Sequence, residues 1–103
     1  MLTSAALEGF KKFIESNIAY AKVTVGGKSE KVLIQRRERM KDGKIAIYIS
    51  ITPQSSTTVN LTKVQLYNNN NEVWAEKNEN IPIKKVNEGL LYRFKFDFTE
   101  SEG

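Results

Sequence analysis

Residues 44–52 read KIAIYISIT, and every second residue from 45 to 51 is isoleucine. Successive side chains of a β-strand point to opposite faces, so this period of two places all four isoleucines on one face. β-Branched side chains also favour extended backbone, where they pack well against neighbouring strands. The stretch therefore predicts a central strand whose isoleucine face lies against the protein core.

A second alternating stretch, residues 90–98, reads LLYRFKFDF. Its even-numbered positions are apolar or aromatic, and Arg93, Lys95 and Asp97 lie between them. Exposed aromatic side chains beside basic ones can stack nucleic-acid bases, but ribonucleoprotein motifs of this kind carry glycine between the aromatics. No glycine occurs within this stretch. The pattern therefore favours a strand with an aromatic face in the core and a charged face in water.

A single helix is expected before the strands, at about residues 4–17. Leu7, Phe10 and Ile14 recur there at spacings of three and four, and Phe13 widens the apolar stripe. Such a stripe is typical of an amphipathic helix with one face buried. We expect the helix to pack against the sheet, and docking onto a partner protein is the alternative.

Turn residues divide the remainder of the chain into short strands. Gly26-Gly27 and Asp42-Gly43 are hairpin signals, and four asparagines at 68–71 predict a further tip because asparagine tolerates positive φ. The expected strands cover residues 18–25, 29–35, 44–52, 59–67, 72–77 and 90–98, with a short edge segment at 81–86 that contains Pro82.

These elements predict one mainly β domain over residues 1–103, with the helix at 4–17, a β-domain at about 18–98 and a short C-terminal tail at 99–103. The expected architecture is a six- or seven-stranded antiparallel β-sandwich or open barrel, with the helix closing one end or face. Strict alternation in the strand at 59–67 places Val64 and Leu66 on one face and Leu61 on the other.

The composition excludes several classes of function. The chain has no cysteine and no histidine, which removes disulfides, the usual transition-metal ligands and the usual base that activates a nucleophile. No acidic pair or glycine-rich loop has the spacing of a catalytic or phosphate site. We therefore expect no enzymatic activity, no cofactor and no metal site.

The N-terminus, MLTSAALEGFKKF, lacks the basic segment and apolar run of a signal peptide. No apolar stretch approaches the roughly 20 residues that a membrane span needs. We expect a chain that is cytoplasmic when synthesised and has no membrane span.

Trp74 is the only tryptophan of the chain. An indole ring offers a large contact area at low entropic cost, so Trp74 is a candidate anchor for a partner protein. Tyr67, Asn69 and Asn70 lie shortly before it and complete this candidate surface. Two other interpretations stay open, in which Trp74 caps the edge of the core or stacks on a carbohydrate.

Basic residues are concentrated between positions 28 and 44, although the net charge of the chain is only +4. Lysine and arginine side chains that neutralise phosphates give salt-dependent binding of nucleic acid. The candidate phosphate contacts are Arg36, Arg37, Arg39, Lys41 and Lys44. Glu38 and Asp42 interrupt the run, and a solvated hairpin is the simpler interpretation.

The segment from Val59 to Phe98, which contains LTKVQLYNNNNEVWAEKNENI and NEGLLYRFKFDF, resembles small proteins encoded among the structural genes of phages and prophages of Gram-positive bacteria. In that group a short helix precedes a β-domain that ends in a Gly-Leu-Leu-Tyr-Arg-Phe-like strand. The present chain departs from the group at Asn68–Asn71, where a glycine-bearing turn is more usual. The resemblance implies a virion- or tail-associated accessory role and transfers no functional residue.

The leading hypothesis is therefore a noncatalytic structural or protein-interaction module that binds other proteins, with self-association as one form of binding. The first alternative is a small nucleic-acid-binding module that uses the basic hairpin at residues 36–44. The second is a carbohydrate-binding module that acts through Trp74.

Overall fold

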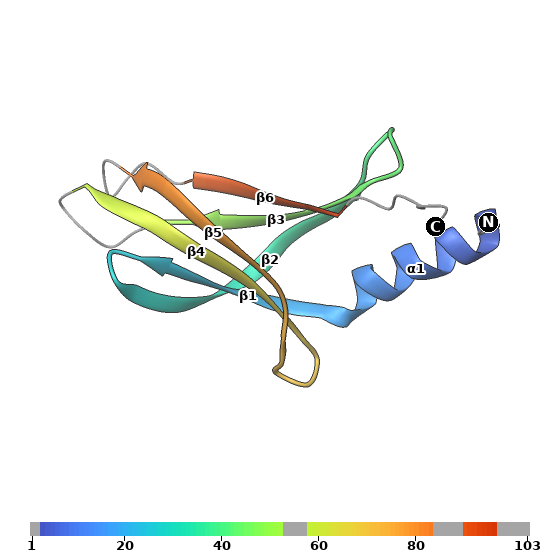
Figure 1. Ribbon diagram of the computed structural model, residues 1–103, viewed down its shortest axis with the longest axis horizontal. Coiled ribbons are helices and arrows are strands. Elements are labelled where there is room, and N and C mark those ends of the chain that lie inside the picture. Colours follow the sequence, from blue (N-terminus) through green and yellow to red (C-terminus); the bar gives the residue numbers. More distant parts are fainter. Residues whose placement is uncertain (1–2, 53–57, 84–89, 97–103) are drawn as a thin grey trace, which may run out of the picture.

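One helix and six antiparallel strands make up the fold in the computed structural model, which describes residues 3–52, 58–83 and 90–96 (Figure 1). The elements are α1 (Ser4–Asn17), β1 (Ile18–Val25), β2 (Lys28–Arg39), β3 (Ile45–Ile51), β4 (Val59–Asn68), β5 (Val73–Ile83) and β6 (Leu90–Phe96). The strands form one sheet in the order β5-β4-β1-β2-β3-β6. This sheet curls into a nearly closed barrel, which confirms the mainly β prediction.

The isoleucine face of β3 forms the centre of the core. Its four isoleucines are each at most 3% exposed, and β3 pairs with β2 on one side and β6 on the other. In the pairing with β6, Ile49 lies opposite Tyr92 and Ile47 opposite Phe94. Tyr92 is buried, whereas Arg93 on the same strand is exposed. The aromatic face of β6 is therefore a wall of the core, as predicted; residues 97–103 lie outside the described part of the chain.

The two free edges of the sheet, β5 and β6, approach each other through side chains. The Tyr92 hydroxyl donates a hydrogen bond to the Glu79 carboxylate, and the rings of Trp74 and Phe96 lie 6.2 Å apart between centroids. Burial, together with the Glu79 carboxylate, raises the pKa of the Tyr92 hydroxyl. In the described residues no backbone pairing joins these strands, so the line between them is a seam closed by side chains alone.

The predicted hairpin turns are present, but β2 is longer than expected. Gly26 and Gly27 both have positive φ, at 59° and 80°, as a tight turn of this type requires. The strand β2 was expected to end near residue 35 and instead continues to Arg39, because its charged residues pair with β3. Residues 40–44 connect β2 to β3, and a hydrogen bond from the Met40 amide to the Lys44 carbonyl closes this turn.

Two predictions for β4 and β5 are wrong. Leu61, Val64 and Leu66 are all fully buried, because a register shift between residues 61 and 63 breaks the strict alternation. The segments at 72–77 and 81–86 were expected to be separate, whereas β5 is continuous over Val73–Ile83 and the described residues form six strands; residues 84–86 lie outside the described part of the chain. Pro82 does lie in an edge strand, as expected, since a proline removes a donor that an edge does not need.

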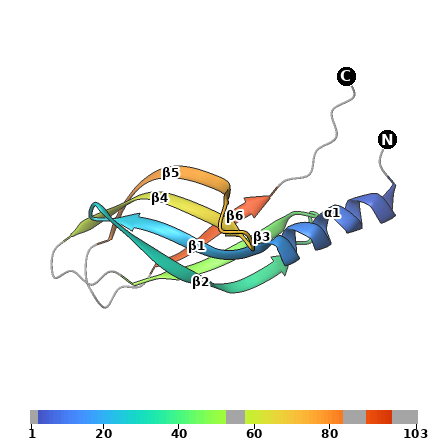
Figure 2. The same ribbon diagram turned by 90° about the horizontal axis from the view of Figure 1, so that it is seen from below.

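The expected packing of α1 on the sheet is also wrong. The helix follows the direction of β1 and projects beyond the end of the barrel (Figures 1 and 2). Ile14 is its only buried residue, while Phe10 and Phe13 are 49% and 55% exposed. The reason is that β1 begins at Ile18, directly after Asn17, so no loop allows the helix to fold back over the sheet.

Replacing Ile47 with alanine should lower the free energy of unfolding by about 2–5 kcal/mol, since the side chain is fully buried and its removal leaves a cavity. The measurement is urea denaturation followed by circular dichroism. Leu33→Ala is the matched control, because Leu33 is 73% exposed and its truncation should change stability by about 0.5 kcal/mol or less. Equal effects of the two substitutions would contradict the assignment of the core.

Candidate functional site

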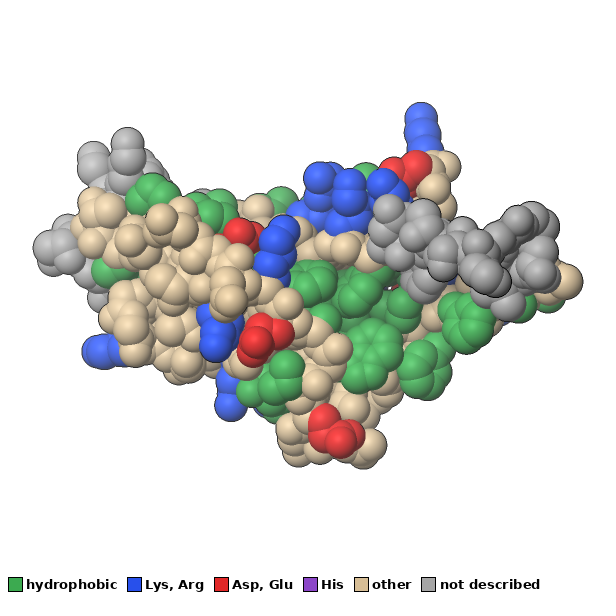
Figure 3. All heavy atoms as spheres, in the orientation of Figure 1, with side chains coloured by type: hydrophobic (Ala, Val, Ile, Leu, Met, Phe, Trp, Pro, Cys, Tyr) green, Lys and Arg blue, Asp and Glu red, His purple; other side chains and the backbone are tan. Residues whose placement is uncertain are grey.

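Aromatic side chains from three elements meet where α1 leaves the barrel. The ring centroids of Phe13 and Trp74 lie 6.0 Å apart, and those of Trp74 and Phe96 lie 6.2 Å apart. Phe10 lies one helical turn before Phe13 on the same side of α1. We refer to Phe10, Phe13, Trp74 and Phe96 as the aromatic surface. In the space-filling view, hydrophobic side chains gather between the barrel and the helix (Figure 3).

The exposure of the aromatic surface is graded. Phe13 is 55% exposed and Trp74 is 37% exposed, while Phe96 is half-buried against Phe94. The outer rings on the helix are therefore open to water, whereas the rings on the barrel are partly covered. Phe96 was expected to belong to the core wall alone; its place at the end of β6 brings it to the end of the barrel beside Trp74.

Tyr67 belongs to a different surface from Trp74. Tyr67 pairs across the strands with Val73, and a register shift at this point leaves Trp74 as the extra residue of β5. Tyr67 stacks on Tyr20, with 4.9 Å between centroids, and the Lys22 ammonium lies 5.0 Å from its ring. Trp74 instead contacts Phe13 and Phe96, so the structure does not bring Tyr67 and Trp74 together as one stacking surface.

The asparagine tip is organised by a buried side chain. Asn68 is 7% exposed, and its carbonyl oxygen accepts hydrogen bonds from the backbone amides of Asn70 and Glu72, both at 2.9 Å. The Asn69 side chain donates to the Ser16 carbonyl at 3.1 Å, near the end of α1. Of the two candidate interaction residues here, Asn69 is thus used to hold the helix, and the exposed Asn70 remains available to a partner.

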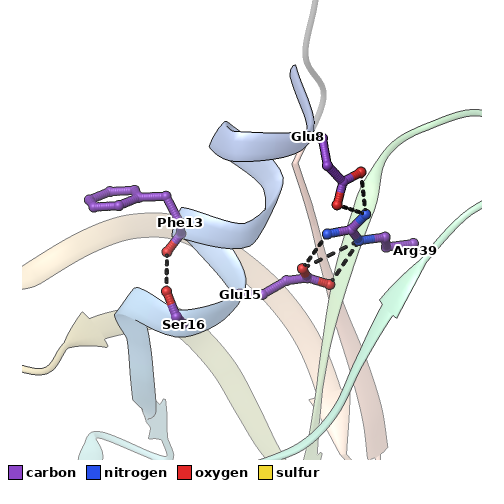
Figure 4. A network of polar contacts seen from close by, with 5 residues as sticks. All are labelled: Glu8, Phe13, Glu15, Ser16 and Arg39. Carbon is purple, nitrogen blue, oxygen red and sulfur yellow. Dashed lines mark hydrogen bonds and ion pairs between the residues drawn. The ribbon is translucent and has the colours of Figure 1, made fainter. Parts of the chain in front are cut away.

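Arg39 holds the opposite side of α1. Its guanidinium contacts the carboxylate of Glu8 and donates to Glu15 at 2.8 Å (Figure 4). The hydrogen bond from Arg39 holds the pKa of Glu8 below its ordinary value of 4.5. In Figure 4, Phe13 points away from this cluster on the other side of the helix. The ion pairs therefore leave the aromatic side of α1 uncovered.

The structure does not bring the five basic candidates together as one phosphate-binding surface. Arg37 donates to the Ile18 carbonyl at 2.7 Å, and Arg39 is occupied by its two carboxylates. Arg36 stacks on a tyrosine ring and pairs with Glu38 at 3.2 Å. Lys44 pairs with the neighbouring Asp42, while Lys41 is exposed at the turn. Arg37 and Arg39 thus serve the fold, a role that the sequence pattern did not indicate.

Comparisons with known protein families, curated proteins and solved structures gave no match. The resemblance to phage and prophage proteins therefore stays a prediction. Within residues 3–52, 58–83 and 90–96, no group of three or more acidic, histidine or cysteine side chains could hold a metal ion. No helix in the same part of the chain is long and apolar enough to cross a membrane.

Replacing Asn68 with alanine should lower the free energy of unfolding by about 1–3 kcal/mol, since two backbone amides of the tip lose their acceptor. The measurement is urea denaturation. Asn70→Ala is the control, because the Asn70 side chain is exposed and should contribute little. If Asn70→Ala were the more damaging substitution, the buried asparagine would not organise the tip.

Replacing Arg39 with alanine should destabilise the protein most at neutral pH and least in acid. The folded-state pKa of Glu8 is below 4.5. The stability that the ionised Glu8 carboxylate gives the folded protein is therefore complete above pH 4.5, and it is lost as the pH falls through the lowered pKa. The difference in free energy of unfolding between wild type and Arg39→Ala should therefore shrink below pH 4.5. Lys28→Ala, at the far hairpin, is the control, and its difference in free energy of unfolding from wild type should not shrink in acid. If the difference for Arg39→Ala stayed constant with pH, the ion pair would be refuted.

Proposed function

We propose that this protein is a noncatalytic protein-interaction module that binds its partners through the aromatic surface. The observation that carries the proposal is the contact of Phe13, Trp74 and Phe96 from three separate elements, with Phe13 open to water and Trp74 partly exposed. Partly exposed tryptophan and other aromatic side chains supply much of the binding energy at protein interfaces. A cluster of them on a monomer is typical of an interaction site.

The position of α1 supports the same proposal. An isolated helix of 14 residues is marginal in water, and this one buries a single side chain in the barrel. The chain nevertheless holds it in place with Arg39 on one side and Asn69 at its end. Such anchoring presents the apolar face of the helix in a defined orientation, which reduces the entropy that binding must overcome.

A virion- or tail-associated role is part of this proposal and rests on the resemblance of residues 59–98 to phage and prophage proteins. Partners of such a module are other structural proteins or further copies of the same chain. Both kinds of partner would cover the aromatic surface, so the same substitutions test both.

The proposal is tested with Phe13→Ala and Trp74→Ala, measured against structural proteins encoded beside the gene and against the chain itself. Titration calorimetry and sedimentation velocity would detect the two kinds of association. Each substitution should weaken association by about 30-fold, the effect of losing about 2 kcal/mol at a hot spot. Leu33→Ala removes an exposed apolar side chain elsewhere and should have no effect.

The only tryptophan provides a second readout. Burial of Trp74 by a partner should shift its fluorescence emission to shorter wavelength. Association that left this emission unchanged and tolerated Phe13→Ala would show that the interaction uses another surface.

A further inference from the structure

Basic side chains border the aromatic surface along β6. Lys95 directly precedes Phe96, and Arg93 shares the outward face of the strand with it. Both are exposed, and neither forms an ion pair or hydrogen bond with another side chain in the described part of the molecule. In Figure 3 a group of basic side chains lies immediately beside the hydrophobic area.

The β2–β3 turn extends this border. Lys44 precedes Ile45, which pairs with Phe96 across the strands, so Lys44 lies next to the end of β6. Asp42 is the acidic residue of the turn; it is paired with Lys44, and the charge of Lys95 also helps to lower its pKa. Positive charge therefore predominates beside Phe96.

The acidic residues of α1 do not offset this charge. Glu8 and Glu15 are both engaged by Arg39, on the side of the helix that points away from Phe13. The helix also carries Lys12, exposed and next to Phe13 in the sequence. A partner that reaches the aromatic surface thus meets exposed cations on β6 and no free carboxylate from the ion-pair cluster.

We propose that the partner segment is acidic, with a large apolar side chain seated on the aromatic surface and carboxylates paired with Arg93 and Lys95. This inference rests on the proposed function and adds the chemistry of the partner. The apolar contact supplies most of the affinity, while the charge pairs select the partner and speed association. An arginine can also grip a carboxylate with two parallel hydrogen bonds.

The graded exposure favours a protein segment over an anionic membrane. Phe10 and Phe13 are about half exposed, but Trp74 is less so and Phe96 is half-buried. A protruding side chain of a protein can reach the recessed rings on the barrel. A lipid surface would engage mainly the outer rings on the helix.

The test uses a short fluorescein-labelled peptide with Leu and Phe at helical spacing and Glu at the remaining positions. The matched probe carries Gln in place of every Glu. Binding of each peptide to the full chain is measured by fluorescence anisotropy. At low salt the Kd of the Glu peptide should be about ten-fold lower than the Kd of the Gln peptide, and added salt should reduce this difference.

Charge reversal locates the contact. Lys95→Glu and Arg93→Glu should each weaken binding of the Glu peptide by about five-fold or more and leave the Gln peptide unaffected. Lys28→Glu makes the same change in net charge at the far hairpin and should leave both peptides unaffected. Phe13→Ala should weaken both peptides.

Equal binding of the two peptides, or equal effects of Lys95→Glu and Lys28→Glu, would overturn the acidic partner. If Phe13→Ala still weakened binding in that case, the proposed function would stand and only the acidic partner would be wrong. If Phe13→Ala had no effect on binding of any partner, the proposed function would be wrong as well. Absence of binding by either peptide would also overturn the inference. The inference would also be overturned if phosphatidylglycerol vesicles or a single-stranded oligonucleotide bound more tightly than the Glu peptide and this binding depended on Lys95.

Discussion

The chain passes from α1 to β1 at Ile18 without a loop, and the arrangement of the candidate site depends on this junction. Ile18 is 1% exposed, and its carbonyl accepts a hydrogen bond from Arg37. The helix is therefore carried along the direction of β1, away from the barrel. Its apolar face is left beside the ends of β5 and β6, where Trp74 and Phe96 lie.

Much of the barrel follows from short-range pattern. The alternation in β3 and β6 predicted which faces are buried, because each strand has one face in the core along its described length. The same reasoning failed in β4, where a bulge between residues 61 and 63 moves Leu61 to the inner face. A bulge depends on pairing with distant strands and leaves no local signal. The continuity of β5 through Asn78 and Asn80 was missed for the same reason.

The candidate site was only partly predictable. Trp74 was expected at a surface or at the edge of the core, and it lies at that edge with 37% of its area exposed. Its contact with Phe13 was not foreseen, because an amphipathic stripe does not reveal whether the helix packs on its own sheet. The roles of Arg37 and Arg39 were equally hidden, since a run of charges gives no indication of its partners. Each of these features depends on the direction in which α1 leaves the barrel.

The seam between β5 and β6 has a consequence for aggregation. Exposed sheet edges present unpaired amides and carbonyls to which a strand of another molecule can add. Here both edges of the sheet face each other, with Tyr92 and Glu79 between them, so each edge shields the other from an incoming strand. Pro82 interrupts the pattern of donors along β5. We therefore expect the barrel to resist edge-to-edge polymerisation without a hydrogen-bonded closure.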